Sequence, residues 1–133
     1  YPGLLKRRQE IIEKYNNAFK GLDITVLNHK DGNHVSSGHL YITRVNGITE
    51  EKRNEIIIKM AEQGIATNVH YKPLPMLTAY KNLGFDIKDY PNAYNYFANE
   101  ITLPLYTKLT DEDVDYVCKC FSKVVSKYIN KEV

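Results

Sequence analysis

The sequence has no tryptophan, two cysteines and seven glycines among its 133 residues. The glycines are scattered, so the chain offers no glycine-rich loop of the kind that holds phosphate groups. Cys118 and Cys120 lie two apart in a predicted helix, where about 100° of rotation per residue turns them to nearly opposite sides. We therefore expect neither a disulfide nor a shared metal ion, and such cysteines favour a reducing, cytoplasmic compartment.

Long apolar runs and a strong charge imbalance are also missing. No apolar run approaches the roughly 18 residues that a membrane-spanning helix needs. The net charge of +2 gives no reason to expect nucleic acid or a membrane surface as a partner. With 43% hydrophobic and 26% charged residues, the composition is that of an ordinary globular chain, and the length suits one domain.

The chain contains a mixed series of helix and strand patterns. Such a mixture predicts an α+β fold with a small sheet covered by helices, although periodicity does not fix the strand order. Pro104 cuts the last strand short, which favours an edge position. The predicted strands are residues 24–27, 38–45, 66–71 and 101–105, and the predicted helices are residues 1–22, 49–63, 76–83, 91–98 and 110–128.

Several helix ends and turns carry local signals. Thr49 is a predicted N-cap, and Thr110 begins a capping box with Asp113 at its third helical position. Gly64 is the predicted residue that ends the second helix, and Asp31-Gly32 indicates a turn.

The first helix carries an apolar stripe that is long for a chain terminus. We expect this stripe to lie exposed and to drive self-association, because large exposed apolar surfaces usually mark interaction sites. Its members are Leu4, Leu5, Ile11, Ile12 and Tyr15.

A proline-stiffened loop, residues 69–75, follows the third predicted strand, and such loops often carry binding groups. His70 is either a satisfied structural histidine or a substrate contact. Tyr71 suits a core aromatic whose hydroxyl finds a partner, with substrate contact as the alternative. Lys72 is either a solvated charge or a partner for a substrate diphosphate.

His29, His34 and His39 recur five residues apart. A metal site needs ligands that converge on one point. Two of these histidines fall in a predicted loop and the third opens a strand, so we expect no metal site.

Short motifs follow one another in a fixed order along the chain. They are His39-Leu40-Tyr41, Gly64-Ile65, His70-Tyr71-Lys72-Pro73, Tyr80, Leu83-Gly84, Pro91-Asn92-Ala93-Tyr94, Thr102-Leu103-Pro104-Leu105-Tyr106 and Thr110. This ordered series resembles the C-terminal part of the DegT–StrS family of PLP-dependent nucleotide-sugar aminotransferases. The opening helix, with Arg7-Arg8 and Tyr15, is also similar to the family segment that leaves the large domain.

Three positions depart from the family pattern. Tyr94 stands where the family usually has glutamate, and Thr102 where it usually has serine. Pro75 stands where many members carry a second histidine, which removes any substrate contact that relies on that histidine.

The resemblance implies a small, mostly antiparallel sheet covered by helices, like the C-terminal small domain of fold type I PLP-dependent transferases. It also implies that His70, Tyr71 and Lys72 bind substrate, with His70 as a donor to a sugar hydroxyl or phosphate. The implied reaction transfers an amino group from glutamate, through PLP, to a keto sugar of a nucleotide-sugar. The implied setting is a homodimer that serves polysaccharide or surface-glycan biosynthesis.

The lysine that binds PLP in this family lies in the large N-terminal domain, in a Ser-x-His-x-x-Lys motif. That motif does not occur in these 133 residues, and the chain begins with Tyr1-Pro2. We therefore interpret residues 1–133 as a single C-terminal domain, with a leading helix over residues 1–22 and an α+β domain over residues 23–133. The catalytic large domain is expected to be absent, so the chain alone should be inactive and hold no cofactor.

Two other functions stay open. A domain of this size can be a stand-alone module that binds a metabolite or mediates assembly. The family also includes PLP-dependent sugar dehydratases, in which histidine replaces the lysine. The sequence upstream of this chain would distinguish all three.

Overall fold

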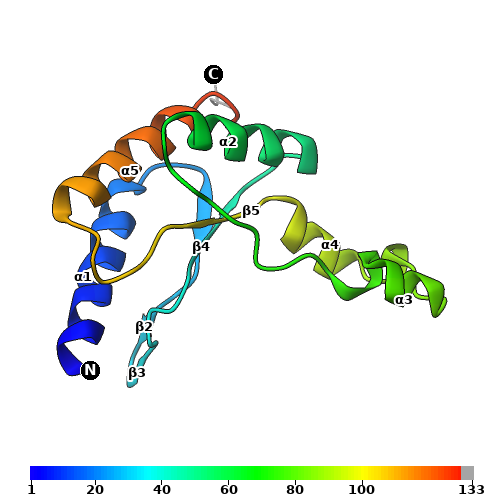
Figure 1. The fold of residues 1–133 in the computed structure, drawn as a ribbon, viewed down its shortest axis with the longest axis horizontal. Helices are drawn as coiled ribbons and strands as arrows, with labels where there is room; N and C mark the ends of the chain where they lie inside the picture. Colours follow the sequence, from blue (N-terminus) through cyan, green and yellow to red (C-terminus); the bar gives the residue numbers. More distant parts are fainter. Residues whose placement is uncertain (130–133) are drawn as a thin grey trace.

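The computed structural model describes residues 1–129 (Figure 1). No helix in this range is long and apolar enough to cross a membrane. The helices are α1 (Pro2–Ala18), α2 (Glu50–Glu62), α3 (Thr78–Asn82), α4 (Pro91–Ala98) and α5 (Asp111–Val125), with short 3-10 turns η1 (Leu74–Met76) and η2 (Ile87–Asp89). The strands are β1 (Ile24–Val26), β2 (Lys30–Asp31), β3 (His34–Val35), β4 (Tyr41–Val45) and β5 (Glu100–Leu103).

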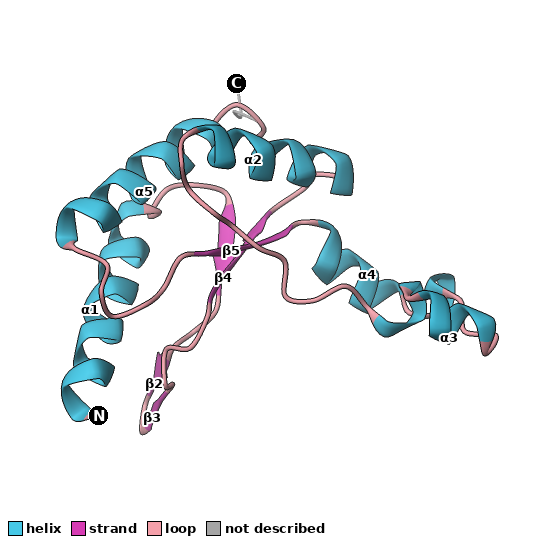
Figure 2. Ribbon diagram, in the orientation of Figure 1, coloured by secondary structure: helices cyan, strands magenta, loops and turns pink. Residues whose placement is uncertain are grey.

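A three-stranded antiparallel sheet in the order β1-β4-β5 lies at the centre, which confirms the α+β prediction. Thr43 of β4 stands opposite Ile101 of β5. Because successive side chains on a strand point to opposite faces, Ile101 faces the apolar core under α1, α2 and α5, while Glu100 and Thr102 share the other face. Figure 2 shows α1 beside α5, with α4 and α3 projecting away from the central strands. The strand that precedes Pro104 is at the edge of this sheet, as predicted.

The first helix packs against α5, which buries most of its apolar stripe but leaves Leu4, near the start of α1, 51% exposed. Ile11 and Tyr15 are completely buried, and Tyr15 Oη donates a hydrogen bond of 2.7 Å to the carbonyl oxygen of Pro104. On the next turn, the rings of Phe19 and Phe121 lie 5.2 Å apart. The prediction of an open stripe was therefore wrong for Ile11, Ile12 and Tyr15, because α5 presents a matching apolar stripe to α1, and only the part of the stripe in the first turn of α1 keeps apolar surface exposed.

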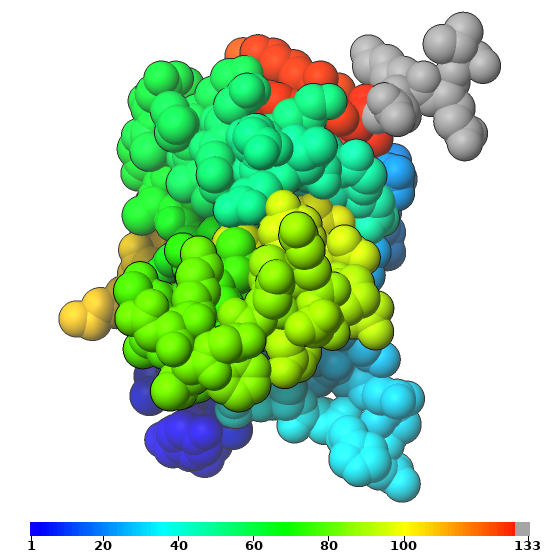
Figure 3. Space-filling model, turned by 90° about the vertical axis from the view of Figure 1, so that its right-hand side faces the viewer, coloured from blue at the N-terminus to red at the C-terminus, as the bar shows by residue number. Residues whose placement is uncertain are grey.

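Two segments project from this core. β2 and β3 form a small hairpin that turns at Gly32, whose φ of +49° confirms the predicted turn. Residues 71–98 form an arm that contains α3 and α4 and joins the core through the buried side chains of Phe97 and Ala98. Figure 3 shows the arm, in green to yellow, across one side of the molecule, with the cyan hairpin projecting beyond it.

The local capping signals are confirmed. Thr49 Oγ1 accepts a hydrogen bond from the backbone N–H of Lys52. Thr110 and Asp113 form the predicted capping box, and Gly64 has the positive φ of +79° that glycine adopts without steric cost.

The predicted strand over residues 66–71 was wrong. Only Asn68 pairs with β5, as an isolated bridge to Thr102. The ladder stops because side chains take the next two backbone donors. Asn68 Oδ1 accepts from the N–H of Val69, and a Glu100 carboxylate oxygen accepts from the N–H of His70.

Candidate functional site

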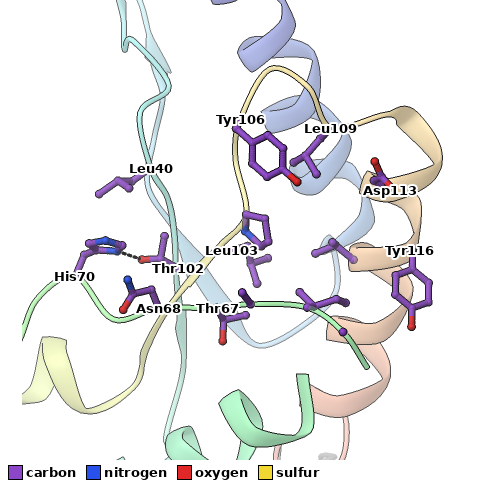
Figure 4. Close-up of a pocket in the computed structure, with 15 residues that line it drawn as sticks. Leu40, Thr67, Asn68, His70, Thr102, Leu103, Tyr106, Leu109, Asp113 and Tyr116 are labelled. Carbon is purple, nitrogen blue, oxygen red and sulfur yellow. Dashed lines mark hydrogen bonds between the residues drawn. The ribbon is translucent and has the colours of Figure 1, made fainter. Parts of the chain in front are cut away.

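A cavity of about 580 Å³ lies beside β5, and we call it the β5 cavity (Figure 4). Its walls come from the segment that follows α2, from β5 with the loop after it, and from the first turns of α5. Most of the lining is apolar, and a few polar groups converge on it, as in typical small-molecule sites. These polar groups include Asn68, His70, Thr102, Tyr106 and Asp113.

His70 is held at two points in the wall of the β5 cavity. Its backbone N–H donates a hydrogen bond of 2.8 Å to Glu100 Oε2. Its ring nitrogen Nδ1 lies 2.9 Å from Thr102 Oγ1, and that hydroxyl donates to Glu100 Oε1 at 2.6 Å. One carboxylate therefore fixes both the backbone and, through Thr102, the ring of His70.

Glu100 is completely buried, which is costly for a charged group unless hydrogen bonds compensate. Burial raises the pKa of its carboxyl group, while the hydrogen bonds from Thr102 and from the His70 backbone oppose that rise. The positive charge of Arg53 also opposes that rise, and the pKa of Glu100 stays above its ordinary value. The strand position explains this placement, because Glu100 and Thr102 are two residues apart and so share a face.

Arg53 joins α2 to the beginning of β5. It is 2% exposed, and its Nη1 donates hydrogen bonds to the carbonyl oxygens of Phe97 at 2.6 Å and Glu100 at 3.3 Å. Its guanidinium also lies 4.6 Å from the centre of the Phe97 ring. Arg53 thereby supports the strand that carries Glu100 and Thr102.

Tyr71 and Lys72 do not line the β5 cavity. The Tyr71 side chain is 72% exposed, so the expectation of a core aromatic was wrong. The peptide bond between His70 and Tyr71 is cis, and the two rings meet edge to face with centres 4.6 Å apart. Lys72 is exposed at the base of the arm. Of the three predicted site residues, the structure brings only His70 into the cavity wall.

Sequence reasoning missed Glu100 and Arg53. The available signal for Glu100 was a glutamate directly before an apolar strand pattern, two residues before the motif residue Thr102. The signal for Arg53 was its spacing of three and seven residues from Ile56 and Met60, which places it on the buried side of α2.

The three other histidines do not meet. His29 Nδ1 is 2.7 Å from Ser36 Oγ, and its ring stacks on Tyr41. Burial lowers the pKa of His29. In the described range, residues 1–129, no three histidine, cysteine, aspartate or glutamate side chains converge in a group that could hold a metal ion.

Comparisons with known proteins agree on one family. The sequence model of the DegT/DnrJ/EryC1/StrS aminotransferase family matches residues 2–122. The spore coat polysaccharide biosynthesis protein SpsC of Bacillus subtilis is 37% identical over 128 residues, which cover 90% of this chain and 32% of SpsC. A UDP-4-amino-4,6-dideoxy-N-acetyl-beta-L-altrosamine transaminase of Campylobacter jejuni is 28% identical over 124 residues, which cover 92% of this chain and 32% of the transaminase.

This chain is also similar to part of solved aminotransferase structures. Spr1654 of Streptococcus pneumoniae, a protein assigned as a sugar aminotransferase, is 57% identical in its PLP-form, with a TM-score of 0.93. The match covers 98% of this chain and 33% of Spr1654. The chain thus spans about a third of the length of the relatives it matches.

Proposed function

The chain belongs to the DegT/DnrJ/EryC1/StrS aminotransferase family, and we propose that it is the C-terminal domain of a PLP-dependent sugar aminotransferase. In this proposal residues 1–22 form a leading helix, residues 23–133 form the small α+β domain, and a large N-terminal domain carries the catalytic lysine. The observation that carries the proposal is the 57% identity to Spr1654, which has been solved in both a PLP-form and a PMP-form. PMP is the aminated form of PLP, so both forms are expected of an enzyme that moves an amino group.

The proposed substrate is a keto sugar attached to a nucleotide, and the proposed amino donor is glutamate. The Campylobacter jejuni relative is named for a UDP-linked amino sugar, and the Bacillus subtilis relative for polysaccharide biosynthesis. These names support a role in the synthesis of a polysaccharide or surface glycan.

In the proposed enzyme, this domain binds and orients the nucleotide-sugar. His70 would contact the sugar, because it alone of the three predicted site residues lines the β5 cavity. Lys72 follows two residues later and is exposed, so its ammonium group is available to a diphosphate. Tyr71 offers an exposed ring and hydroxyl, which suit a ligand surface that is partly apolar and partly wet.

PLP supplies the electron sink for amino transfer when it is bound. The β5 cavity does not provide a site for PLP by itself. None of its fifteen lining residues, all in the described part of the chain, is a lysine or an arginine, the side chains suited to bond its aldehyde carbon or to pair with its phosphate. We therefore assign PLP binding to the large domain, and substrate orientation and exclusion of water to the residues described above.

We also propose a homodimer in the cytoplasm. The cytoplasmic assignment draws on Cys118 and Cys120, which are both free and buried. Burial raises the pKa of Cys118 to about 11, so this thiol stays protonated and unreactive at neutral pH.

The test begins with the coding sequence upstream of this chain. A Ser-x-His-x-x-Lys motif there supports the aminotransferase, whereas histidine at the lysine position supports a dehydratase. A start codon directly before the codon of Tyr1 would support a stand-alone module and overturn the proposal. The protein that contains the motif is then supplied with PLP, glutamate and a UDP-linked 4-keto sugar, and the formation of 2-oxoglutarate and the amino sugar is measured.

A further inference from the structure

The hydrogen bonds around Thr102 constrain the position of one proton on His70. A threonine hydroxyl has a single proton to donate, and an ionised carboxylate can only accept. Because Thr102 Oγ1 lies 2.6 Å from Glu100 Oε1, its proton is directed to the carboxylate. Toward His70 Nδ1, at 2.9 Å, the same oxygen can then only accept.

We propose that Glu100, acting through Thr102, is a positioning residue that holds neutral His70 as its Nδ1–H tautomer and so makes Nε2 a hydrogen-bond acceptor in the wall of the β5 cavity. Glu100 does not touch the ligand in this arrangement. The ligand group that fits an acceptor is one that carries a proton, such as a sugar hydroxyl. An ionised phosphate oxygen has no proton to offer, so the neutral ring discriminates against it.

Two features of the site keep this arrangement in place, and a third leaves Nε2 available to a ligand. Glu100 is 0% and Thr102 5% exposed, so water has little access to replace either partner. Glu100 uses both carboxylate oxygens, one for Thr102 and one for the His70 backbone. Among the described residues, Nε2 makes no hydrogen bond, since the contacts of His70 involve only its backbone N–H and Nδ1.

Glu100→Gln gives a specific test because an amide has one accepting and one donating end. The His70 backbone N–H requires the amide oxygen on its side. The amide NH₂ group then faces Thr102 and donates to it, so the threonine proton turns toward His70 Nδ1. That nitrogen must now accept, and the proposal therefore predicts that this substitution converts His70 from the Nδ1–H to the Nε2–H tautomer.

The experiment is long-range ¹H–¹⁵N correlation NMR of this chain labelled in its histidine rings. It is recorded at about pH 8.5, two units above the ordinary histidine pKa of about 6.5. The His70→Asn variant assigns the His70 signals. We expect the unmodified chain to show the Nδ1–H pattern for His70, and Glu100→Gln to shift the major population to the Nε2–H pattern.

Two variants of Thr102 keep the test decisive if Glu100→Gln does not fold. Thr102→Ser keeps the hydroxyl and should keep the Nδ1–H pattern. Thr102→Val removes the acceptor for Nδ1–H, so the Nδ1–H population should fall. An Nε2–H pattern in the unmodified chain, or an unchanged Nδ1–H pattern in Glu100→Gln, would overturn the inference, and if Glu100→Gln does not fold, an unchanged Nδ1–H pattern in Thr102→Val would overturn it.

The meaning of Nε2 as a sugar contact rests on the proposed function, but the tautomer is measured without any ligand. If the Nδ1–H pattern is found and no nucleotide-sugar binds the complete protein, the role of Glu100 and Thr102 in setting the tautomer stands and the proposed function fails. If His70→Asn weakens sugar binding while the tautomer is Nε2–H, the proposed function stands and that role of Glu100 and Thr102 fails.

Discussion

The guanidinium group of Arg53 donates a hydrogen bond of 2.6 Å to the carbonyl oxygen of Phe97. Arg53 comes from α2, and Phe97 lies in the last turn of α4, where the arm returns to the sheet. The carbonyl groups at the end of a helix have no partner within the helix. Arg53 supplies a partner for two carbonyls at this buried junction, and so links the core, the arm and the beginning of β5.

Replacement of Arg53 by methionine should therefore destabilise the chain. The apolar volume is roughly kept, but the buried carbonyl of Phe97 loses the hydrogen bond from Arg53 and keeps only the one from the backbone N–H of Asn99, at a cost of about 1–3 kcal/mol. Urea unfolding followed by circular dichroism measures the change. Lys52→Met is the matched control, because Lys52 is exposed on the same helix and should change the free energy of unfolding by less than about 0.5 kcal/mol. Equal effects of the two substitutions would contradict the role of Arg53.

Gly38 lies where the chain passes close to α1. Its φ is +63°, and a Cβ atom there would approach Ile12 Cδ1 to 3.0 Å and Arg8 Cβ to 3.2 Å. Gly38→Ala should lower the free energy of unfolding by about 1–2 kcal/mol through the backbone conformation alone. The contact of the new Cβ with α1 should lower it further. Gly32→Ala is the control, since Gly32 also has a positive φ but no atom within 4 Å of a Cβ. Thermal unfolding of the two variants should show a larger fall in melting temperature for Gly38→Ala than for Gly32→Ala. An equal or smaller fall for Gly38→Ala would show that the contact with α1 is unimportant.

The ion pairs between α1 and α5 should make the free energy of unfolding depend on pH. The hydrogen bond from Arg7, followed by the charge of Lys14, lowers the pKa of Asp111 below its ordinary value of 3.8. The folded chain therefore binds this proton less tightly than the unfolded chain. The stabilisation of the fold by ionised Asp111 is fully present above the pKa that Asp111 has in the unfolded chain. It is lost as the pH falls through the lower pKa that Asp111 has in the folded chain.

Asp111→Asn tests this expectation. The difference in free energy of unfolding between the unmodified chain and the variant should be present at neutral pH, shrink in strong salt, and vanish at a pH below the folded pKa of Asp111. Glu112→Gln, a neighbouring exposed position, controls for the loss of one negative charge. A pH-independent difference for Asp111→Asn would exclude the ion pairs as its cause.

The parts of the fold that depend on local sequence were the easiest to predict. The last helix carries its own capping box and a regular apolar stripe, and α5 follows both. Residues 66–71 have the composition of a strand, but their pairing is decided by Asn68 and by Glu100, which is some 30 positions further along the chain. No local pattern reveals that a distant carboxylate will take a backbone donor.

The same distinction applies to the candidate site. His70 was predicted because it belongs to a motif and follows a strand pattern. Glu100 and Arg53 have sequence spacings that place them beside apolar positions, but their importance comes from burial that the packing of α2, α4 and β5 creates. The exposure of Tyr71 was missed for the converse reason, because an aromatic residue beside a strand usually packs inside.

The last prediction concerns His70 in the complete enzyme proposed above. If its ring makes one hydrogen bond to the sugar, His70→Ala should cost about 1–3 kcal/mol in transition-state stabilisation, which is roughly a ten- to hundredfold loss of kcat/KM for the nucleotide-sugar. The glutamate half-reaction should lose much less, because a small donor has no sugar to place against the β5 cavity. Single-turnover measurements separate the two half-reactions, and His34→Ala, in the exposed hairpin, serves as the control. Equal losses in both half-reactions, or a large fall in melting temperature with unchanged sugar kinetics, would show that His70 supports the structure rather than the substrate.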